Sequence, residues 1–358
     1  MADGFFLLDP NGTRELQHRL SGKNPWRPLR PAFRLFGNSN ALRIQLFLEI
    51  RALAKKRIRK GRLSRYLASI LPQGTAYLNV GHSNLSAEVF QAFRTIPEAQ
   101  ITVMLHDTIP LDFPKFQRPD AVSDFSQKFQ LTMKNSDLLL CVSQQTKKDV
   151  LHHCNGRSDT PNITVAHLGV NDLTPDTREL PAGLNLKRSY FVMLGTIEPR
   201  KNHTLMLDVW EKLTLAGDAP HLFIIGQRGW NNKNVFDRLD RHPKNVTELN
   251  NLSDGAVASL LKSSCGLVFP SHAEGFGLPA VEAAKLGVPV ICSNLEVFHE
   301  VLGEYPIYAD VTDLYDWETK IRKLANSDGK NDNGESRQYQ VKSLPTWDEH
   351  FNVVLRLT

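Results

Sequence analysis

The 358-residue chain contains few cysteines and no long apolar segment. Its four cysteines lie far apart and include no C-x-x-C pair, which argues against a disulfide framework or a thiolate metal site. Two of them, Cys141 and Cys292, lie in apolar runs of strand length, so we expect buried free thiols. No apolar run approaches the roughly 20 residues that a membrane-spanning helix requires.

The sequence also lacks the signatures of several enzyme classes. It contains no D-x-D pair for a metal-bound nucleotide-sugar, no G-x-x-x-x-G-K-[ST] phosphate loop, no H-E-x-x-H and no G-x-S-x-G. We therefore expect neither metal-dependent transfer, nor P-loop hydrolysis, nor serine hydrolysis. The first residues, MADGFFLLD, show no basic segment ahead of a long apolar one, so no secretory signal is visible and a cytoplasmic location is expected.

Basic side chains are concentrated in one short segment. The 43 Lys and Arg exceed the 38 Asp and Glu by five, but residues 51–65 (RALAKKRIRKGRLSR) hold eight basic residues and no acidic one. The rest of the chain therefore carries a formal charge of −3, since 5 less 8 is −3. This distribution argues against a general nucleic-acid binder and favours a local contact with an anionic surface. The alternative is a solvated helix surface.

Helical spacing runs through the basic segment. Phe47, Ile50, Ala54 and Ile58 are three or four residues apart, and apolar residues resume the same spacing beyond Gly61. This spacing is typical of amphipathic helices. We therefore expect two helices, broken at Gly61, that carry the basic residues.

From residue 75 onward, short apolar runs alternate with helical stretches. This alternation is typical of parallel sheets with crossover helices, so the expected fold class is α/β. The expected strands are 75–80, 101–105, 137–142, 163–168, 190–195, 221–226, 245–249, 266–271 and 288–293. Ser86 and Ser143 are expected to cap helices that run to Arg94 and His153. The other expected helices are 203–215, 254–263, 279–286 and 347–355.

A polar connector divides the α/β pattern into two halves. Residues 171–188 are rich in Pro, Asp and Thr, and the strand pattern restarts directly after them. We expect an N-terminal domain over 1–175, a C-terminal domain over 189–340 and a closing amphipathic helix within 345–358. Residues 326–337 are polar and Gly-rich, so we expect a loop there.

A strand end, a glycine-containing turn and a helix start follow one another in the segment PSHAEGFGLPAVEAAKLGVPVICSN. Backbone N–H groups of Gly277, Leu278 and their neighbours would face the cleft beyond the strand ends, which suits a phosphate. Glu274 and Glu282 flank the same site, and a carboxylate such as Glu282 can accept two hydroxyls of a sugar or ribose. The alternative is that both are solvated acids favoured by the helix dipole.

A second polar segment, GTIEPRKNH, begins at Gly195 and also directly follows an apolar strand. Arg200 and Lys201 at the carboxyl edge of a parallel sheet can neutralise a diphosphate without a metal. Because adjacent side chains seldom face the same way, we expect only one of the two to be the main phosphate ligand. The alternative is a surface turn in which Glu198 pairs with Arg200.

A third strand ends at His106 and Asp107, in the segment MLHDTIPLDFP. An imidazole at a strand end of the first half can exchange a hydrogen bond with a substrate hydroxyl. His82 holds a similar position after the strand expected at 75–80. The alternative for a lone histidine is a structural role, and we assign that role to His82.

Together, four segments resemble the family-4 retaining glycosyltransferases of GT-B fold. They are HDTIPL, GTIEPRKNH, IGQRGW and EGFGLPAVE, in the right chain order. The resemblance is to bacterial enzymes that build surface polysaccharides such as lipopolysaccharide. It implies an α/β GT-B fold: two Rossmann-like domains with parallel sheets facing a central cleft, and a last helix that packs back on the N-terminal domain. One segment departs from the pattern, because FFLLDPNGTR is a poor match to the first strand and Gly-rich loop of such enzymes.

The resemblance also implies roles for individual residues. The implied donor-binding residues are Gly195, Thr196, Arg200, Lys201, Glu274, Gly275, Phe276, Gly277, Leu278 and Glu282. Among these, Lys201 and Arg200 would bind the diphosphate, Glu282 the ribose, and Glu274 with the backbone after it the transferred sugar. His106, Glu274 and Lys201 would surround the reaction centre, with His106 and Asp107 on the acceptor side. Residues 228–230 and 249–252 would lie near the base.

The activity that the resemblance implies is retaining, metal-independent transfer of a hexose without a cofactor. The donor would be a nucleotide-sugar, with GDP-mannose favoured over UDP-sugars, and the acceptor a lipid-linked oligosaccharide or polysaccharide. Residues 51–65 would contact an anionic membrane on the inner face of the plasma membrane, and no nucleic acid is expected. The alternatives are a UDP-sugar-dependent transferase of the same fold, a GT-B sugar-nucleotide epimerase, and a non-catalytic module that binds an anionic polymer through its basic residues.

Overall fold

The computed structural model describes residues 4–20, 38–59, 61–154, 160–326 and 343–358. The chain divides into two compact units. Unit 1 comprises residues 1–77 and 84–101, and unit 2 comprises residues 78–83 and 102–358. The domain boundaries expected between 175 and 189 and between 340 and 345 stay predictions, since unit 2 contains both.

Unit 1 joins a small antiparallel sheet to helices. Strands β1 (Gly4–Leu7) and β2 (Lys56–Arg59) pair with Phe5 opposite Ile58. The helices of this unit are α1 (Pro10–Leu20), α2 (Asn38–Leu53), α3 (Leu63–Ile70) and α4 (Ala87–Arg94). Ile58, Leu67 and Val89 are buried in one cluster, so β2, α3 and α4 share a small apolar core.

Of the first helix predicted for the basic segment, the structure confirms the part up to Leu53 and contradicts the end. Helix α2 ends at Leu53, and the predicted helical turn over Lys56–Arg59 is strand β2. Ile58 is buried while its neighbours are exposed, which is the alternation of a half-buried strand, and pairing with β1 fixes it. Helical spacing in the sequence is therefore overridden by a tertiary strand contact. The second predicted helix is confirmed, since α3 begins two residues after Gly61.

The first parallel sheet has the strand order β3–β4–β5–β6. Its strands are β3 (Ala76–Asn79), β4 (Gln100–Leu105), β5 (Leu138–Cys141) and β6 (Asn162–Val165). Strand β5 runs parallel to both neighbours and is buried along its whole length, as expected for a covered sheet. The helices that follow β4 and β5 are α5 (Ile109–Asp112), α6 (Pro119–Asn135) and α7 (Gln144–His153). Strand β1 pairs with β2 outside this sheet.

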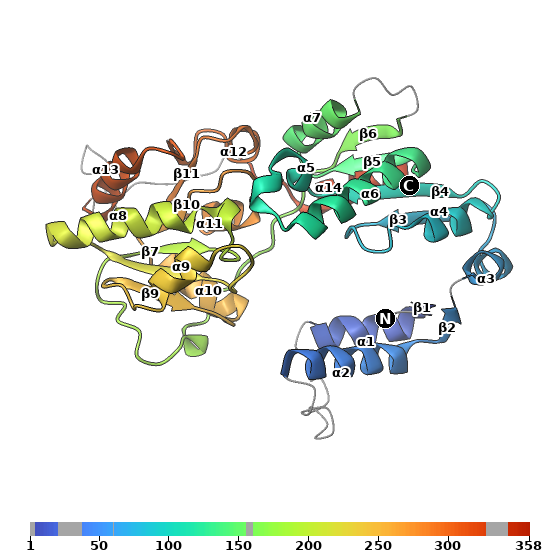
Figure 1. Cartoon of the computed structure of the whole chain (residues 1–358), viewed down its shortest axis with the longest axis horizontal. Helices are drawn as coiled ribbons and strands as arrows, with labels where there is room; N and C mark the ends of the chain where they lie inside the picture. Colours follow the sequence, from blue (N-terminus) through green and yellow to red (C-terminus); the bar gives the residue numbers. More distant parts are fainter. Residues whose placement is uncertain (1–3, 21–37, 60, 155–159, 327–342) are drawn as a thin grey trace. The chain divides into compact units, whose positions relative to one another are not determined.

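The second parallel sheet has the strand order β12–β11–β10–β7–β8–β9 (Figure 1). Its strands are β7 (Tyr190–Leu194), β8 (His221–Ile225), β9 (Val246–Leu249), β10 (Gly266–Phe269), β11 (Val290–Ser293) and β12 (Ile307–Ala309). Its helices are α8 (His203–Ala216), α9 (Lys233–Leu239), α10 (Asp254–Lys262), α11 (Leu278–Lys285), α12 (Glu296–Leu302) and α13 (Leu314–Ala325).

Helices cover both faces of the second sheet. Phe191 and Met193 of β7 share one core with residues of α8, α9 and α13. Tyr190 and Val192 of the same strand share the other core with residues of α10, α11 and α12. This alternation follows from the strand geometry, because successive side chains point to opposite faces. Because the strands of this sheet run parallel, the polar residues that follow them emerge at the same carboxyl edge.

Helix α14 (Trp347–Leu357) contacts the residues that follow β6. Its N-terminus has a capping box between Thr346 and Glu349. The Nδ1 atom of His350 lies 2.8 Å from the carbonyl oxygen of His167. A Cβ atom on Gly169 would lie 2.3 Å from the backbone nitrogen of Trp347, so only glycine permits this close approach. The predicted closing helix is confirmed.

Most of the predicted elements are confirmed. Each of the nine predicted strands overlaps an observed one, whereas β2 and β12 were not predicted as strands. The hydroxyls of Ser86 and Ser143 accept hydrogen bonds from Val89 N and Thr146 N at 3.4 Å and 3.0 Å, as expected of N-caps. The loop predicted at 326–337 lies outside the described residues apart from Asn326.

The four cysteines are free thiols, and Cys141, Cys154 and Cys292 are buried. This confirms the prediction of buried thiols for Cys141 and Cys292. Within the described part of the chain, no helix combines the length and the apolar character that crossing a membrane requires.

Candidate functional site

Four charged side chains meet where the adjacent strands β7 and β10 end. Arg200 Nη2 lies 2.7 Å from Glu198 Oε1, and Arg200 Nη1 lies 2.9 Å from Glu274 Oε2. Lys201 Nζ lies 2.5 Å from Glu274 Oε1. None of the four side chains is more than 15% exposed. In this group, here called the buried ion cluster, Glu274 is not solvated, and the predicted pair of Glu198 with Arg200 forms in a buried turn and not in a surface turn.

The turn over Pro199–Lys201 brings both cations to one carboxylate. It is a 3₁₀ turn, and Asn202 after it has a left-handed backbone with φ of 56° before α8 begins. The expectation that adjacent Arg200 and Lys201 face different ways is wrong. Both long side chains reach Glu274 from this tight turn, and Arg200 Nη1 also donates to Ala273 O at 2.7 Å.

Lys201 and Arg200 keep the Glu274 carboxylate ionised. Burial alone would raise its pKa, but Lys201 and Arg200 outweigh that effect and hold the pKa of Glu274 below its ordinary value. The ammonium of Lys201 also lies 4.5 Å from the centre of the Phe269 ring. Two acids and two bases sum to a neutral cluster, which is why these charges tolerate burial. Asp107 lies next to this cluster, and burial raises its pKa.

Glycines shape the loop between Glu274 and α11. A Cβ atom on Gly275 would lie 1.9 Å from the carbonyl oxygen of His106. Gly277 has φ of 84°, and a Cβ there would lie 2.4 Å from the Phe298 ring. Both positions therefore require glycine. As predicted, a proline then occupies the first turn of α11.

Backbone N–H groups in this loop, those of Gly275, Phe276 and Gly277 among them, have no hydrogen-bond acceptor among the described residues. Phe276 and Gly277 are buried, yet no residue of the described chain accepts a hydrogen bond from either N–H. A buried donor left unpaired costs about 1–3 kcal/mol. The two N–H groups thus fit an oxygen atom of a ligand at the start of α11.

A cavity of about 380 Å³ brings together Gly195, Thr196 and Glu282. Here called the Glu282 cavity, it is also lined by Gln227, Asn171, Asn251, Leu252 and Asp254. Burial, with a smaller effect of Asp254, raises the pKa of Glu282. Gly195 connects this cavity to the buried ion cluster, because a Cβ there would lie 3.4 Å from Lys201 Cε.

A second cavity of about 400 Å³ is lined by Asp107 and Glu274. Here called the Glu274 cavity, it has apolar walls from Ile109, Phe113, Leu295 and Val297, and further polar walls from Asp112, Gln145, Thr146, Asp149, His272, Asn294 and Glu296. Glu274 and Glu282 thus line different cavities, although the sequence predicted one site. The buried ion cluster contacts both cavities.

The His106 imidazole is held by the backbone near β3. His106 Nε2 lies 2.7 Å from Val80 O, and its backbone N–H donates to His82 Nε2 at 3.3 Å. Burial, with smaller effects of His106 and Lys128, lowers the pKa of His82 to about 4, so this ring is neutral and can accept that bond. The contact gives His82 the structural role that we expected. Asp107, not His106, lines the Glu274 cavity.

Residues 177–341 match the family model described as Glycosyl transferases group 1. The chain carries a glycosyltransferase group 1 domain. It is 31% identical over 269 residues to the serotype-specific mannosyltransferase WbdA of Escherichia coli, covering 68% of this chain and 33% of WbdA. It is 29% identical over 240 residues to the O-antigen chain mannosyltransferase RfbU of Salmonella typhimurium, covering 61% of this chain and 63% of RfbU. The chain therefore spans about a third of the length of WbdA.

Solved structures show the same fold. The structure of HepE from Anabaena in complex with UDP aligns with a TM-score of 0.63 and 13% identity, covering 83% of this chain and 80% of HepE. Sucrose-phosphate synthase from Thermosynechococcus elongatus aligns with a TM-score of 0.61 and 17% identity, covering 79% of this chain and 72% of the synthase. The predicted GT-B fold is confirmed.

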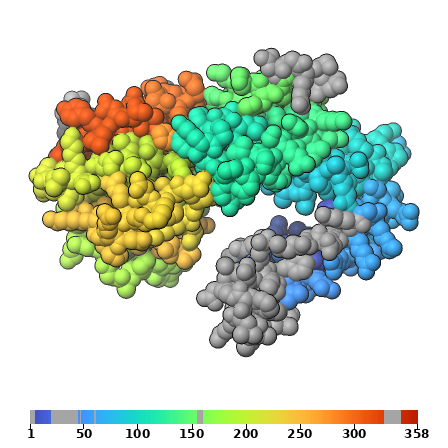
Figure 2. Space-filling model, in the orientation of Figure 1, coloured from blue at the N-terminus to red at the C-terminus, as the bar shows by residue number. Residues whose placement is uncertain are grey.

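Side chains outside the sequence motifs join the group 1 domain to the first sheet. Ser143 Oγ donates to Gly275 O at 2.7 Å, and Glu300 accepts from the backbone N–H of Gln144 at 2.6 Å. Glu300 also pairs with His167 at 2.6 Å. Figure 2 shows the segment of β4–α7 (teal and green) against the yellow and orange second half. The sequence marked Ser143 only as a helix cap and gave no signal for Glu300.

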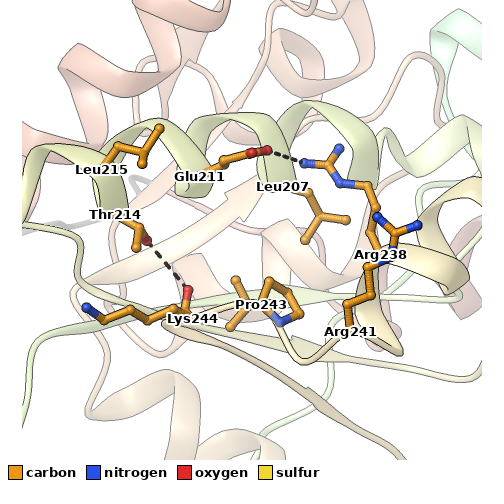
Figure 3. Close-up of a pocket in the computed structure, with 9 residues that line it drawn as sticks. Leu207, Glu211, Thr214, Leu215, Arg238, Arg241, Pro243 and Lys244 are labelled. Carbon is orange, nitrogen blue, oxygen red and sulfur yellow. Dashed lines mark hydrogen bonds and ion pairs between the residues drawn. The ribbon is translucent and has the colours of Figure 1, made fainter.

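A third cavity, of about 280 Å³, lies between α8 and the segment after α9 (Figure 3). Its Arg238 pairs with Glu211 at 3.2 Å and with Asp208 at 2.5 Å, so that charge is neutralised. None of the predicted site residues lines this cavity. It is therefore separate from the candidate site of the group 1 domain.

Proposed function

We propose that the chain is a retaining, metal-independent hexosyltransferase that moves a hexose from a nucleotide-sugar to a glycan acceptor. The observation that carries this proposal is the buried ion cluster, which contacts the Glu282 cavity through Gly195 and the Glu274 cavity through Glu274 itself. The nucleotide would occupy the Glu282 cavity, and the transferred hexose would lie toward the Glu274 cavity. The group 1 domain and the similarity to proteins named mannosyltransferases support this assignment.

Lys201 is the main diphosphate ligand in this proposal. The Nη atoms of Arg200 already donate to Glu198, Glu274 and Ala273 O. Lys201 has three N–H donors, and Glu274 takes one of them. Lys201 therefore keeps donors for phosphate oxygens, while Arg200 fixes the Glu274 carboxylate. Glu282, which lines the Glu282 cavity, would accept hydrogen bonds from the ribose hydroxyls.

The proposed reaction breaks the bond between the sugar C1 and the phosphate oxygen as the acceptor hydroxyl oxygen bonds to C1. Negative charge grows on the departing diphosphate, and Lys201 with the N–H groups before α11 stabilises it most in the transition state. The hydroxyl attacks from the face that the diphosphate leaves, and its proton passes to a phosphate oxygen. Anomeric configuration is then retained. Because side-chain cations and backbone N–H groups of the protein stabilise the negative charge on the diphosphate, no metal or cofactor has a role in this proposal.

We favour GDP-mannose as the donor, with UDP-sugars as the main competitor. The relatives WbdA and RfbU carry names of mannosyltransferases, and RfbU that of an O-antigen chain enzyme, which supports mannose and a lipid-linked or polysaccharide acceptor in cell-surface glycan synthesis. The similar HepE was solved in complex with UDP, so UDP-sugars belong among the donors to compare. The reaction would take place in the cytoplasm.

Donor use tests the proposal directly. The full chain is incubated with GDP-mannose and with UDP-sugars, and nucleotide release and thermal stability are measured. We expect GDP-mannose to raise the melting temperature and to be consumed fastest with a mannose-terminated acceptor. Absence of binding and of turnover with every nucleotide-sugar would contradict the proposal. Consumption without any acceptor requirement, giving an isomeric nucleotide-sugar, would indicate the epimerase instead.

The basic segment would dock the enzyme on an anionic membrane. Arg51, Lys55, Lys56, Arg57 and Arg59 are exposed in unit 1. Each basic residue near an anionic bilayer contributes about 1 kcal/mol. We expect co-sedimentation with vesicles that contain phosphatidylglycerol and loss of binding when Lys56 and Arg57 are changed to Glu. Equal sedimentation with neutral vesicles would show that the segment is only a solvated surface.

A further inference from the structure

We propose that Ser143, assisted by Thr146, is a positioning residue that aims the backbone N–H of Phe276 at the transferred sugar. The inference rests on the proposed function, since it concerns the sugar that the loop before α11 would hold. It assigns to Ser143 a role in coupling donor cleavage to transfer. Neither the family motifs of the sequence nor the lining of the two cavities identifies this serine.

The contact that carries the proposal joins two distant parts of the chain. Ser143 Oγ donates to the carbonyl oxygen of Gly275 at 2.7 Å, across 132 residues of sequence. Thr146 Oγ1 lies 3.4 Å from the same oxygen and 3.4 Å from His106 O. Both hydroxyl side chains are fully buried. A hydrogen bond in such a place is not exchanged with water, so the two hydroxyls fix the carbonyl direction.

Peptide geometry transmits this constraint to the next residue. The carbonyl of Gly275 and the N–H of Phe276 belong to one planar trans peptide, so they point in opposite directions. Fixing the carbonyl on Ser143 therefore fixes the N–H of Phe276. Phe276 is a buried residue, and the described chain offers no acceptor for its N–H. An oxygen atom of a bound sugar or phosphate would accept a hydrogen bond from this N–H.

The close approach of backbones explains why the contact needs Gly275. The position of its missing Cβ lies 1.9 Å from His106 O, so the ends of β4, β5 and β10 meet here without an intervening side chain. The Ser143 hydroxyl thus contacts the backbone of Gly275 in the loop before α11, and the Thr146 hydroxyl contacts the backbone of His106 at the end of β4. Removal of the hydroxyl would leave Gly275 O free to turn, and Phe276 N–H would turn with it.

The chain offers a matched control in Ser86. It caps α4 through Val89 N just as Ser143 caps α7 through Thr146 N, but it lies in unit 1. Loss of either cap removes the same kind of local stabilisation. Ser143→Ala and Ser86→Ala therefore share the capping defect and differ in the contact with Gly275. Ser143→Thr keeps a hydroxyl at the same position.

The experiment compares transfer and hydrolysis in these variants. GDP-mannose is supplied with and without a mannose-terminated acceptor, and free mannose and extended product are quantified. We expect Ser143→Ala to lower kcat for transfer about tenfold, the loss of one well-made hydrogen bond, with the donor KM within about twofold and a larger share of donor lost to water. Ser143→Thr should restore most of the transfer, and Ser86→Ala should leave the product ratio unchanged.

The outcomes separate the two proposals. Unchanged transfer in Ser143→Ala, or an equal loss in Ser86→Ala, would overturn the role of Ser143. If wild-type protein neither binds nor consumes any nucleotide-sugar, the proposed function itself fails and this inference with it. Should Ser143→Ala not fold, the isosteric Thr146→Val replaces it, and a ratio of transfer to hydrolysis equal to that of the wild type would then contradict the proposal.

Discussion

The two cavities beside the buried ion cluster present different chemistry to a ligand. The Glu282 cavity has walls of backbone, amide and apolar groups, with Asp254 and Glu282 as its acids. The Glu274 cavity carries five carboxylates, at Asp107, Asp112, Asp149, Glu274 and Glu296. The first is suited to a base and ribose, which need specific hydrogen bonds. The second offers many acceptors, as a hexose with several hydroxyls needs.

The two glutamates show how environment sets the role of a side chain. Two cations lower the pKa of Glu274 against the effect of burial, whereas burial and Asp254 raise the pKa of Glu282. Glu274 is therefore a fixed charge that orders Lys201 and Arg200. Among the described residues, no cation pairs with Glu282, so its carboxylate is available to hydroxyl donors. In the proposed mechanism, these two residues of one motif, eight positions apart, therefore bind different parts of the donor.

Removal of Lys201 should have the largest effect. Lys201→Ala is expected to lower kcat about 10³-fold, because the growing charge on the diphosphate loses its nearest cation. The measurement is steady-state release of nucleotide, with circular dichroism to confirm folding. Lys244→Ala, at the cavity of Figure 3, is the control and should retain full activity. Wild-type turnover in Lys201→Ala would remove the lysine from the mechanism.

Acid should destabilise the protein through the histidine next to the cluster. Burial, with a smaller effect of Lys201, lowers the pKa of His203 to about 3 from an ordinary 6.5. A histidine with a depressed pKa contributes stability above pH 6.5 that is lost as pH falls toward the folded-state pKa. By pH 4 the loss from His203 is on the order of 3 kcal/mol. Urea unfolding at pH 7 and pH 4 should show a smaller difference in His203→Leu than in the wild type; an equal difference would contradict this.

Removal of Glu282 should have a smaller effect than removal of Lys201. Glu282→Ala is expected to lower kcat/KM about tenfold, mainly through a higher donor KM, because a carboxylate bond to ribose is lost in ground and transition states alike. Lys244→Ala, at the cavity of Figure 3, should leave the donor KM unchanged. Initial rates over a range of donor concentrations distinguish these outcomes. An unchanged donor KM in Glu282→Ala, or an equal rise in Lys244→Ala, would contradict the assignment of the ribose to the Glu282 cavity.

The sequence predicted the fold of unit 2 and its polar strand ends well, because apolar runs and loop motifs are local signals. It did not predict the features that depend on contacts between residues far apart in the chain. Strand β2 exists because Ile58 pairs with Phe5, and no helical spacing can indicate that pairing. Similarly, Arg200 and Lys201 converge because Glu274 lies on the neighbouring strand end. The second bond of Ser143 spans 132 residues, so the sequence showed only its capping role.

The most direct test of the proposed mechanism is the fate of GDP-mannose in the presence of a mannose-terminated acceptor and a metal chelator. Proton NMR of the product reports the anomeric configuration of the new bond, and nucleotide release reports turnover. We expect GDP release at an undiminished rate with chelator, and a product that keeps the α configuration of the donor. An inverted product, or no release from any GDP- or UDP-sugar, would contradict the mechanism.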